Sequence, residues 1–119
     1  MSYFKPEETA CPCCGAVVLQ TSPIMSFANH VRRLLGKSLT ITSGFRCLSY
    51  NRTLPNSSDK SKHIQGVALD ISTENLSGVD KYVMIREAIK MGLRFGIYKS
   101  HIHVDYSSGE KKVCWWGEY

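Results

Sequence analysis

The stretch HIHVD, at residues 101–105, alternates ionisable and apolar side chains with a period of two. This period is typical of a β-strand that has one face toward the protein core. Ile102 and Val104 would face the core, while His101, His103 and Asp105 would share the opposite face. The stretch therefore predicts a strand that presents three ionisable groups on one surface.

A second strand pattern lies upstream, in KHIQGVALDIS at residues 62–72. Its alternation over 67–72 places Asp70 on the face away from the core, and His63 precedes Gly66, which can adopt positive φ and reverse the chain. Two histidines and one carboxylate from separate strands form a ligand set that catalytic Zn²⁺ uses. Spacing alone leaves two interpretations open, a metal site or a solvated strand face.

Helix signals precede each of these regions. Ser22 and Pro23 start an apolar pattern with helical spacing that ends at Gly36, and Ser77 with Asp80 resembles a capping box. We therefore expect helices over about 22–35 and 78–91, and a functional polar loop over 51–62. The expected strands are 39–43, 67–72, 93–98, 101–106 and 113–116, the last three forming an antiparallel meander with a turn at 107–111. The predicted fold class is α+β, a small antiparallel sheet with flanking helices.

Composition restricts the class of protein further. The chain has 119 residues, 43% of them apolar, which suits a single folded domain over residues 1–119 and excludes a disordered polar chain. It contains no run of about 18 apolar residues, so no membrane-spanning helix is expected. The net charge of +5 suggests an anionic partner such as nucleic acid, a membrane surface or an anionic cell-wall polymer. The scattered basic residues also fit a solvated surface with no such partner.

Several motifs occur in the order found in one family of peptidases. They are SGFRC at 43–47, Asn51, SKHIQGVALDI at 61–71 and HIHVD at 101–105. Together they resemble the zinc D-Ala-D-Ala carboxypeptidase family of peptidoglycan peptidases, which is related to the D-Ala-D-Ala dipeptidases and to phage L-alanyl-D-glutamate endolysins. The CPCCG stretch at 11–15 resembles the N-terminus of a small phage or prophage branch. The family pattern Ser-x-His-x-x-Gly-x-Ala-x-Asp, then His-x-His, is matched by Ser61, His63, Gly66, Ala68, Asp70, His101 and His103.

The resemblance implies a hedgehog/D-peptidase-like zinc fold and a role for each matched residue. His63, Asp70 and His103 would bind one Zn²⁺ ion. Arg46 would bind the scissile carbonyl or the substrate carboxylate, for which a guanidinium fork is suited. Ser61 resembles a substrate-contacting position, although it also fits a plain loop serine.

The resemblance assigns the general base to His101. Strand geometry places it about 6.6 Å from His103 on the same face, from a rise of about 3.3 Å per residue. Relatives of the dipeptidase and endolysin type use a carboxylate three residues before the last ligand, and here that position is Ser100, which cannot serve. Asp105 would accept a hydrogen bond from a ligand histidine, or alternatively bind the metal directly.

The expected function is hydrolysis of a D-amino-acid-containing peptide bond in peptidoglycan stem peptides, by a carboxypeptidase or endopeptidase that degrades the cell wall. The alternatives are an L-Ala-D-Glu endopeptidase on the same scaffold, or a non-catalytic zinc-containing wall-binding module. The start MSYFKPEETA lacks a signal-peptide pattern. We therefore expect synthesis in the cytoplasm and action after release, or transport by a virion. A monomer that does not bind nucleic acid and does not insert into a membrane is expected.

Two positions depart from the branch, and the cysteines allow several interpretations. Tyr50 stands where the branch often has His, and 54–60 stands where it often has a Gly-Gly loop, so substrate preference is less defined than metal binding. The five cysteines permit a thiolate zinc site, buried apolar thiols, or a disulfide between the N-terminal arm and Cys47. Their positions are Cys11, Cys13, Cys14, Cys47 and Cys114.

Overall fold

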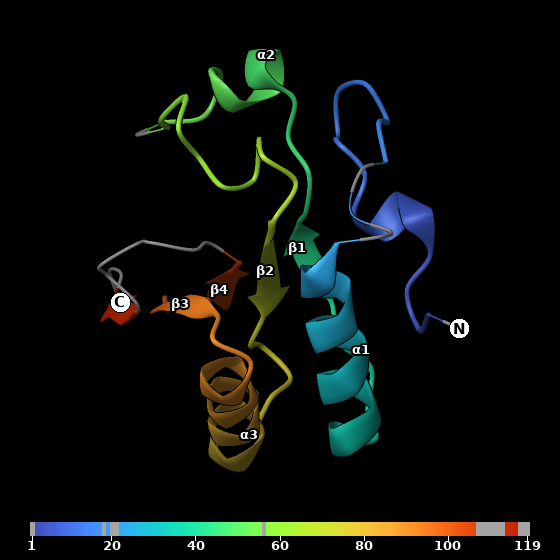
Figure 1. Ribbon diagram of the computed structural model, residues 1–119, viewed down its shortest axis with the longest axis vertical. Coiled ribbons are helices and arrows are strands. Elements are labelled where there is room, and N and C mark those ends of the chain that lie inside the picture. Colours follow the sequence, from blue (N-terminus) through green and yellow to red (C-terminus); the bar gives the residue numbers. More distant parts are fainter. Residues whose placement is uncertain (1, 18, 20–21, 56, 107–113, 117–119) are drawn as a thin grey trace.

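The computed structural model describes residues 2–17, 19, 22–55, 57–106 and 114–116. Figure 1 shows the chain with most of its helices and strands labelled. In chain order the elements are a 3-10 helix η1 (Pro6–Glu8), α1 (Pro23–Leu35), β1 (Ile41–Ser43), α2 (Leu48–Asn51), β2 (Ala68–Ser72), α3 (Gly78–Lys90), β3 (Arg94–Ile97), β4 (His101–Asp105) and β5 (Cys114–Trp116).

The strands form one sheet in the order β1-β2-β4-β3-β5. Three of its four strand pairs are antiparallel, and only β5 runs parallel to its neighbour β3. The strand predicted from HIHVD is β4, which lies at the centre of the sheet with Ile102 and Val104 buried. In this register Asp70 of β2 lies directly opposite His103 of β4. The predicted α+β class with a small, mainly antiparallel sheet and flanking helices is confirmed.

The core lies where α1 and α3 pack against the apolar face of the sheet. Among the residues buried in this one cluster are Phe27 and Val31 from α1, Met84 from α3, and Ile71 and Ile102 from the sheet. Two polar contacts also join the helices. His30 Nε2 lies 2.7 Å from Glu87 Oε1, and Lys37 Nζ lies 2.6 Å from Asp80 Oδ2. The fourth histidine of the chain therefore has a structural partner on the helix side of the molecule.

The helix boundaries follow the signals in the sequence. The hydroxyl of Ser22 accepts a hydrogen bond from the Ile24 amide, and Gly36 ends α1 in the left-handed conformation at φ 65°. Ser77 and Asp80 form a reciprocal capping box at the start of α3. Both predicted helices are confirmed, because local capping chemistry was sufficient to fix where they start.

The N-terminal arm, defined here as residues 2–17, lies beside the segment that leads from β1 to α2 (Figure 1). The Phe45 amide donates to the Thr9 carbonyl at 3.0 Å. Gly44 passes so close to this arm that an added Cβ would lie 2.6 Å from the Thr9 carbonyl oxygen. The arm therefore packs directly against the segment 44–47.

The expected antiparallel meander is wrong in its last step. The strands β3 and β4 form the predicted hairpin, but β5 pairs with the other edge of β3 and runs parallel to it. The reason is that β4 already has β2 and β3 on its two edges, so no edge of β4 is available to the last strand. The expected turn at 107–111 lies outside the described residues.

Within the described part of the chain, no helix is both long and apolar enough to cross a membrane.

The contact between α1 and α3 leads to a prediction of how the stability of the fold changes with pH. Hydrogen bonds from His30 and Arg86 lower the pKa of the buried Glu87 carboxyl to about 2, against an ordinary value of about 4.5. A lowered pKa in the folded state stabilises the fold above pH 4.5, and this stabilisation is lost as the pH falls toward 2. We expect Glu87→Gln to lower the melting temperature at pH 7, with a difference from wild type that shrinks on acidification.

Thermal unfolding followed by circular dichroism from pH 7 to pH 3 measures this difference. Glu74→Gln is the matched control, because Glu74 is exposed and should show no such dependence. Metal lost at low pH is lost from both proteins and cancels in the difference. Equal stability of Glu87→Gln and wild type at pH 7 would contradict the prediction.

Candidate active site

Three sequence-predicted ligands come together on the face of the sheet opposite the helices. His63 Nε2, Asp70 Oδ1 and His103 Nδ1 face one another, and the ligand atoms of these residues lie within 4.8 Å of one another. Asp70 is supplied by β2, His103 by β4, and His63 by the turn that precedes β2. Both imidazoles approach the same oxygen of Asp70, His103 at 2.8 Å and His63 at 3.3 Å.

The orientation of His63 leaves one ring nitrogen for a ligand role. Its Nδ1 lies 2.7 Å from the Gly44 carbonyl oxygen, which can only accept, so Nδ1 carries the proton. Nε2 is then the unprotonated nitrogen of the neutral ring, and this is the atom that faces Asp70. His63 is thus held in the tautomer that a metal ligand requires.

Asp70 is a nearly buried carboxylate with partners on both oxygens. Burial by itself would raise its pKa, but the hydrogen bond from His103 and the nearby imidazole of His63 hold the pKa well below its usual range. Its second oxygen, Oδ2, accepts from Arg46 Nη2 at 3.4 Å. Oδ1 is therefore the oxygen directed at the two histidines.

His103 is held between two carboxylates. Nδ1 faces Asp70, and Nε2 lies 2.8 Å from Oδ2 of Asp105, which is only 1% exposed. Burial lowers the pKa of His103, but its hydrogen bonds to the carboxylates of Asp105 and Asp70 outweigh this effect and raise the pKa. Arg94 Nε lies 3.7 Å from the other oxygen of Asp105. The structure thus places Asp105 behind His103, as expected for an acceptor that orients a ligand, and its role remains a prediction.

His101 lies on the same face of β4 but outside the three-residue cluster. Its ring stacks on Tyr98 with centroids 4.6 Å apart, and its Nδ1 lies 3.1 Å from the Ser100 hydroxyl. Partial burial lowers its pKa, against the raising effect of the Asp70 charge. The neutral imidazole is therefore favoured near pH 7, which is the form that can accept a proton.

Arg46 is fixed by three side chains beside the cluster. Its guanidinium donates to Ser43 at 3.0 Å, to Asn51 at 3.2 Å and to Asp70 at 3.4 Å. Among the described residues these bonds use three of its five N–H donors. Asn51 is fully buried and also donates to the Ser58 carbonyl at 2.9 Å, so it links Arg46 to the following loop.

A surface cavity of about 580 Å³ opens next to the cluster. It reaches His103 and Asp105, while His63, Asp70, Arg46 and His101 do not line it. The remaining lining residues are Ser58, Asp59, Lys60, Ser61, Lys62, Gln65, Arg94 and Trp115. The loop 54–60, where the sequence differs from the phage branch, thus borders this cavity through its residues 58–60. Ser61 also accepts a hydrogen bond from the His63 amide at 3.2 Å, so it has a local structural contact as well.

Sequence analysis missed several residues that position the site. Gly44 supplies the carbonyl that orients His63, and Tyr98 stacks on His101. Trp115 lies 5.4 Å from the His103 ring and donates to the Tyr98 hydroxyl at 2.7 Å. Trp115 reaches the site through the parallel pairing of β5 with β3, which places it opposite Gly96.

Four of the five cysteines form a second cluster, and the exposed Cys114 on β5 is not one of them. Burial raises the pKa of the Cys11 thiol, yet backbone hydrogen bonds from Cys47, Cys14 and Cys13 bring it down to about 6. The pKa of Cys13 is raised to about 12 by its hydrogen bond to Cys47, by burial and by the charge of Cys11. The thiols in this cluster therefore influence one another strongly.

Two imidazoles and one carboxylate that converge on the sheet of an α+β fold are the donor set of a mononuclear zinc hydrolase. Three protein ligands leave a coordination position for water or substrate, and the tautomer of His63 suits a ligand, so the residues fit a zinc ion. A family model described as Peptidase M15 matches residues 2–105, and the chain belongs to this family. It is a metallopeptidase with His63, Asp70 and His103 as its candidate zinc site. Searches of curated proteins and of solved structures gave no significant match.

The donor set predicts how substitutions change metal content. His103→Ala should remove one equivalent of zinc, because it deletes one of three protein ligands. Asp105→Asn should retain the ion but weaken its affinity by about 10-fold to 100-fold, since outer partners orient a ligand histidine. Elemental analysis and competition with a chromogenic chelator measure the two effects. Full zinc content and wild-type affinity in His103→Ala would contradict the assignment.

Proposed function

We propose that the chain hydrolyses a peptide bond next to a D-amino acid in peptidoglycan, at the terminal D-Ala-D-Ala or at a D-Ala cross-link. One observation carries the proposal: the His63–Asp70–His103 cluster has an anchored arginine on one side and a separate, partly buried histidine on the same strand face. This combination offers a metal, an oxyanion donor and a base within one small surface. These are the roles that the family resemblance implies for the metal ligands, for Arg46 and for His101.

Zinc held by His63, Asp70 and His103 would supply a Lewis acid that polarises the peptide carbonyl and makes water more acidic. The chain itself must then accept the proton of the attacking water. With Nδ1–H of His101 donating to the Ser100 hydroxyl, Nε2 keeps its lone pair for that proton. The lowered pKa of His101 keeps it unprotonated at neutral pH. His101 is therefore the proposed general base.

Arg46 would stabilise the negative charge that develops on the carbonyl oxygen, or bind the terminal carboxylate of the substrate. Its bonds to Ser43, Asn51 and Asp70 fix the guanidinium before substrate arrives, and this preorganisation is what makes charge stabilisation effective. Lysine offers no planar fork and cannot make these three bonds together.

Charge around the cavity supports an acidic peptide as substrate. Three basic residues, Lys60, Lys62 and Arg94, line it with two acidic ones, Asp59 and Asp105, so its lining carries an excess of positive charge. Peptidoglycan stem peptides carry free carboxylates, which this cavity would attract.

His101→Ala tests the assignment of the base. It should lower kcat by about 10²-fold to 10⁴-fold, the usual contribution of general base catalysis, while the zinc content stays unchanged. Ser100→Ala is the graded control, since it removes only the partner of Nδ1 and should cost far less activity. Loss of zinc together with activity in His101→Ala would make His101 a ligand and overturn this part of the proposal.

Digestion of purified peptidoglycan, with mass spectrometry of the new termini, tests the reaction itself. We expect release of D-Ala, or new D-Ala carboxyl termini, and no release once a chelator has removed the metal. Arg46→Lys should retain zinc and lower kcat/KM by about 10²-fold. New L-Ala carboxyl termini would instead identify an L-Ala-D-Glu endopeptidase. A zinc-loaded protein that releases no product would contradict the proposal and favour a non-catalytic wall-binding module.

A further inference from the structure

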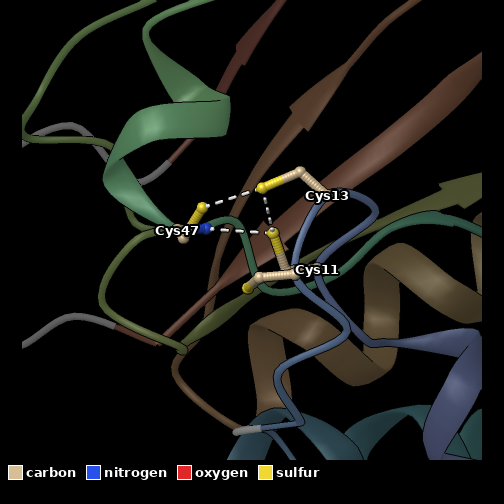
Figure 2. Close-up of side chains that lie close together, drawn as sticks. Cys11, Cys13 and Cys47 are labelled. Atoms are coloured by element: carbon tan, nitrogen blue, oxygen red, sulfur yellow. Dashed lines mark hydrogen bonds between the residues drawn. The ribbon is translucent and has the colours of Figure 1, made fainter.

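A second group of metal-ligating side chains lies apart from the His63–Asp70–His103 cluster. Cys11, Cys13 and Cys14 belong to one turn of the N-terminal arm, and Cys47 lies at the start of α2. The sulfurs of all four lie within 4.8 Å of one another. Figure 2 shows Cys11, Cys13 and Cys47, with their sulfurs directed toward one another from two different parts of the chain.

The distances suit tetrahedral coordination. A Zn–S bond of about 2.3 Å in a regular tetrahedron gives sulfur–sulfur edges of about 3.8 Å. Cys11 Sγ lies 3.8 Å from Cys13 Sγ, and Cys13 Sγ lies 3.2 Å from Cys47 Sγ. These two separations differ from the ideal edge by at most about 0.6 Å. All four sulfurs lie within 4.8 Å of one another, so adjustments of about 1 Å or less would let them surround one ion.

The backbone around the sulfurs is already arranged for thiolates. The Cys47 amide donates to Cys11 Sγ at 3.3 Å, and the Tyr50 amide donates to Cys47 Sγ at 3.4 Å. The turn that carries the first three cysteines is closed by bonds from the Cys11 amide to the Ala16 carbonyl and from the Gly15 amide to the Cys11 carbonyl. Amide groups directed at sulfur stabilise its negative charge, and a closed turn limits the ordering that metal binding requires.

Apolar packing does not explain these side chains. Cys13 and Cys14 are exposed and Cys47 is half-buried, so only Cys11 behaves as a core residue. A single disulfide would use two of the four sulfurs and leave the other two unaccounted for. A closed site of four thiolates accounts for all four positions at once.

We propose that Cys11, Cys13, Cys14 and Cys47 bind one structural Zn²⁺ ion, separate from the ion of the active site. The four thiolates fill the coordination sphere, so this ion has no position for substrate. It is a structural ion that joins the N-terminal arm to the start of α2.

The position of the ion explains what it would stabilise. Cys47 ends the short segment 44–47, which also provides the Gly44 carbonyl that orients His63 and the guanidinium of Arg46. The arm contacts this segment in two further places, at Thr9 with Phe45 and at Thr9 with Gly44. A metal bound by the four cysteines would hold the segment against the arm at the end nearest Arg46.

Metal content of the purified full-length chain, kept reduced, tests the proposal without any measurement of hydrolysis. Elemental analysis should find two zinc ions per chain, and cobalt substitution should produce a thiolate-to-cobalt charge-transfer band. Cys11→Ser and Cys47→Ser should each lose one equivalent and the band. Cys114→Ser is the matched control, because this exposed cysteine lies outside the cluster, and it should keep both ions.

The His103→Ala variant separates the two sites, since it should lose the other equivalent and keep the band. If a cysteine variant fails to fold, the wild-type ion count and spectrum decide the question. One zinc per chain with no thiolate band overturns the proposal, as does a Cys13–Cys47 disulfide in the reduced preparation. Iron bound in place of zinc overturns the identity of the ion. None of these outcomes depends on peptidase activity, so a failure here is distinct from a failure of the proposed function.

Discussion

The structure depends on one buried carboxylate, that of Asp70. An ionised group out of water must be matched by hydrogen bonds or opposite charge, because its desolvation is costly. Here Oδ1 meets both His63 and His103, and Oδ2 meets Arg46. Its three partners come from three parts of the chain: the turn before β2, the central strand β4 and the segment before α2. A metal bound at Oδ1 would place positive charge at this oxygen when its histidines are neutral, in addition to the Arg46 charge at Oδ2.

The burial of this polar face is produced by the sheet and by one aromatic ring. Because β2 and β3 lie on either side of β4, His103 has Asp70 of β2 and Gly96 of β3 as its direct neighbours across the sheet. Trp115 lies across Gly96, where an added Cβ would come within 2.3 Å of the indole, so only glycine allows this approach. The indole lies beside His103 and under Arg94, whose guanidinium carbon is 4.9 Å from the ring. Asp105 is thereby enclosed and can act as a fixed acceptor for His103.

The features that sequence analysis predicted well are those set by local chemistry. The alternation of HIHVD located β4, which spans His101–Asp105 against the expected 101–106, and the capping residues Ser22 and Ser77 fixed the starts of two helices. The ligand cluster followed from motifs, since period and family pattern agreed. Features that depend on which distant segments meet were not accessible in this way. The parallel pairing of β5 depends on which sheet edges are already occupied. The meeting of Cys47 with the CPCCG turn was only one of the interpretations left open by the sequence, because it depends on how the N-terminal arm folds back over 34 positions.

The two candidate metal sites differ in a way that fits different tasks. Two histidines and an aspartate leave a coordination position open, which chemistry on a substrate requires, whereas four thiolates leave none. The segment 44–47 connects them, because it carries Cys47 at one end and the carbonyl partner of His63 at the other. A fixed Cys47 would limit the motion of Arg46, its neighbour in the chain. Arg46 and Gly44 act on the active site through directional hydrogen bonds, and such bonds weaken steeply as their angles change. The N-terminal cysteines would therefore influence the geometry of a reaction that none of them touches.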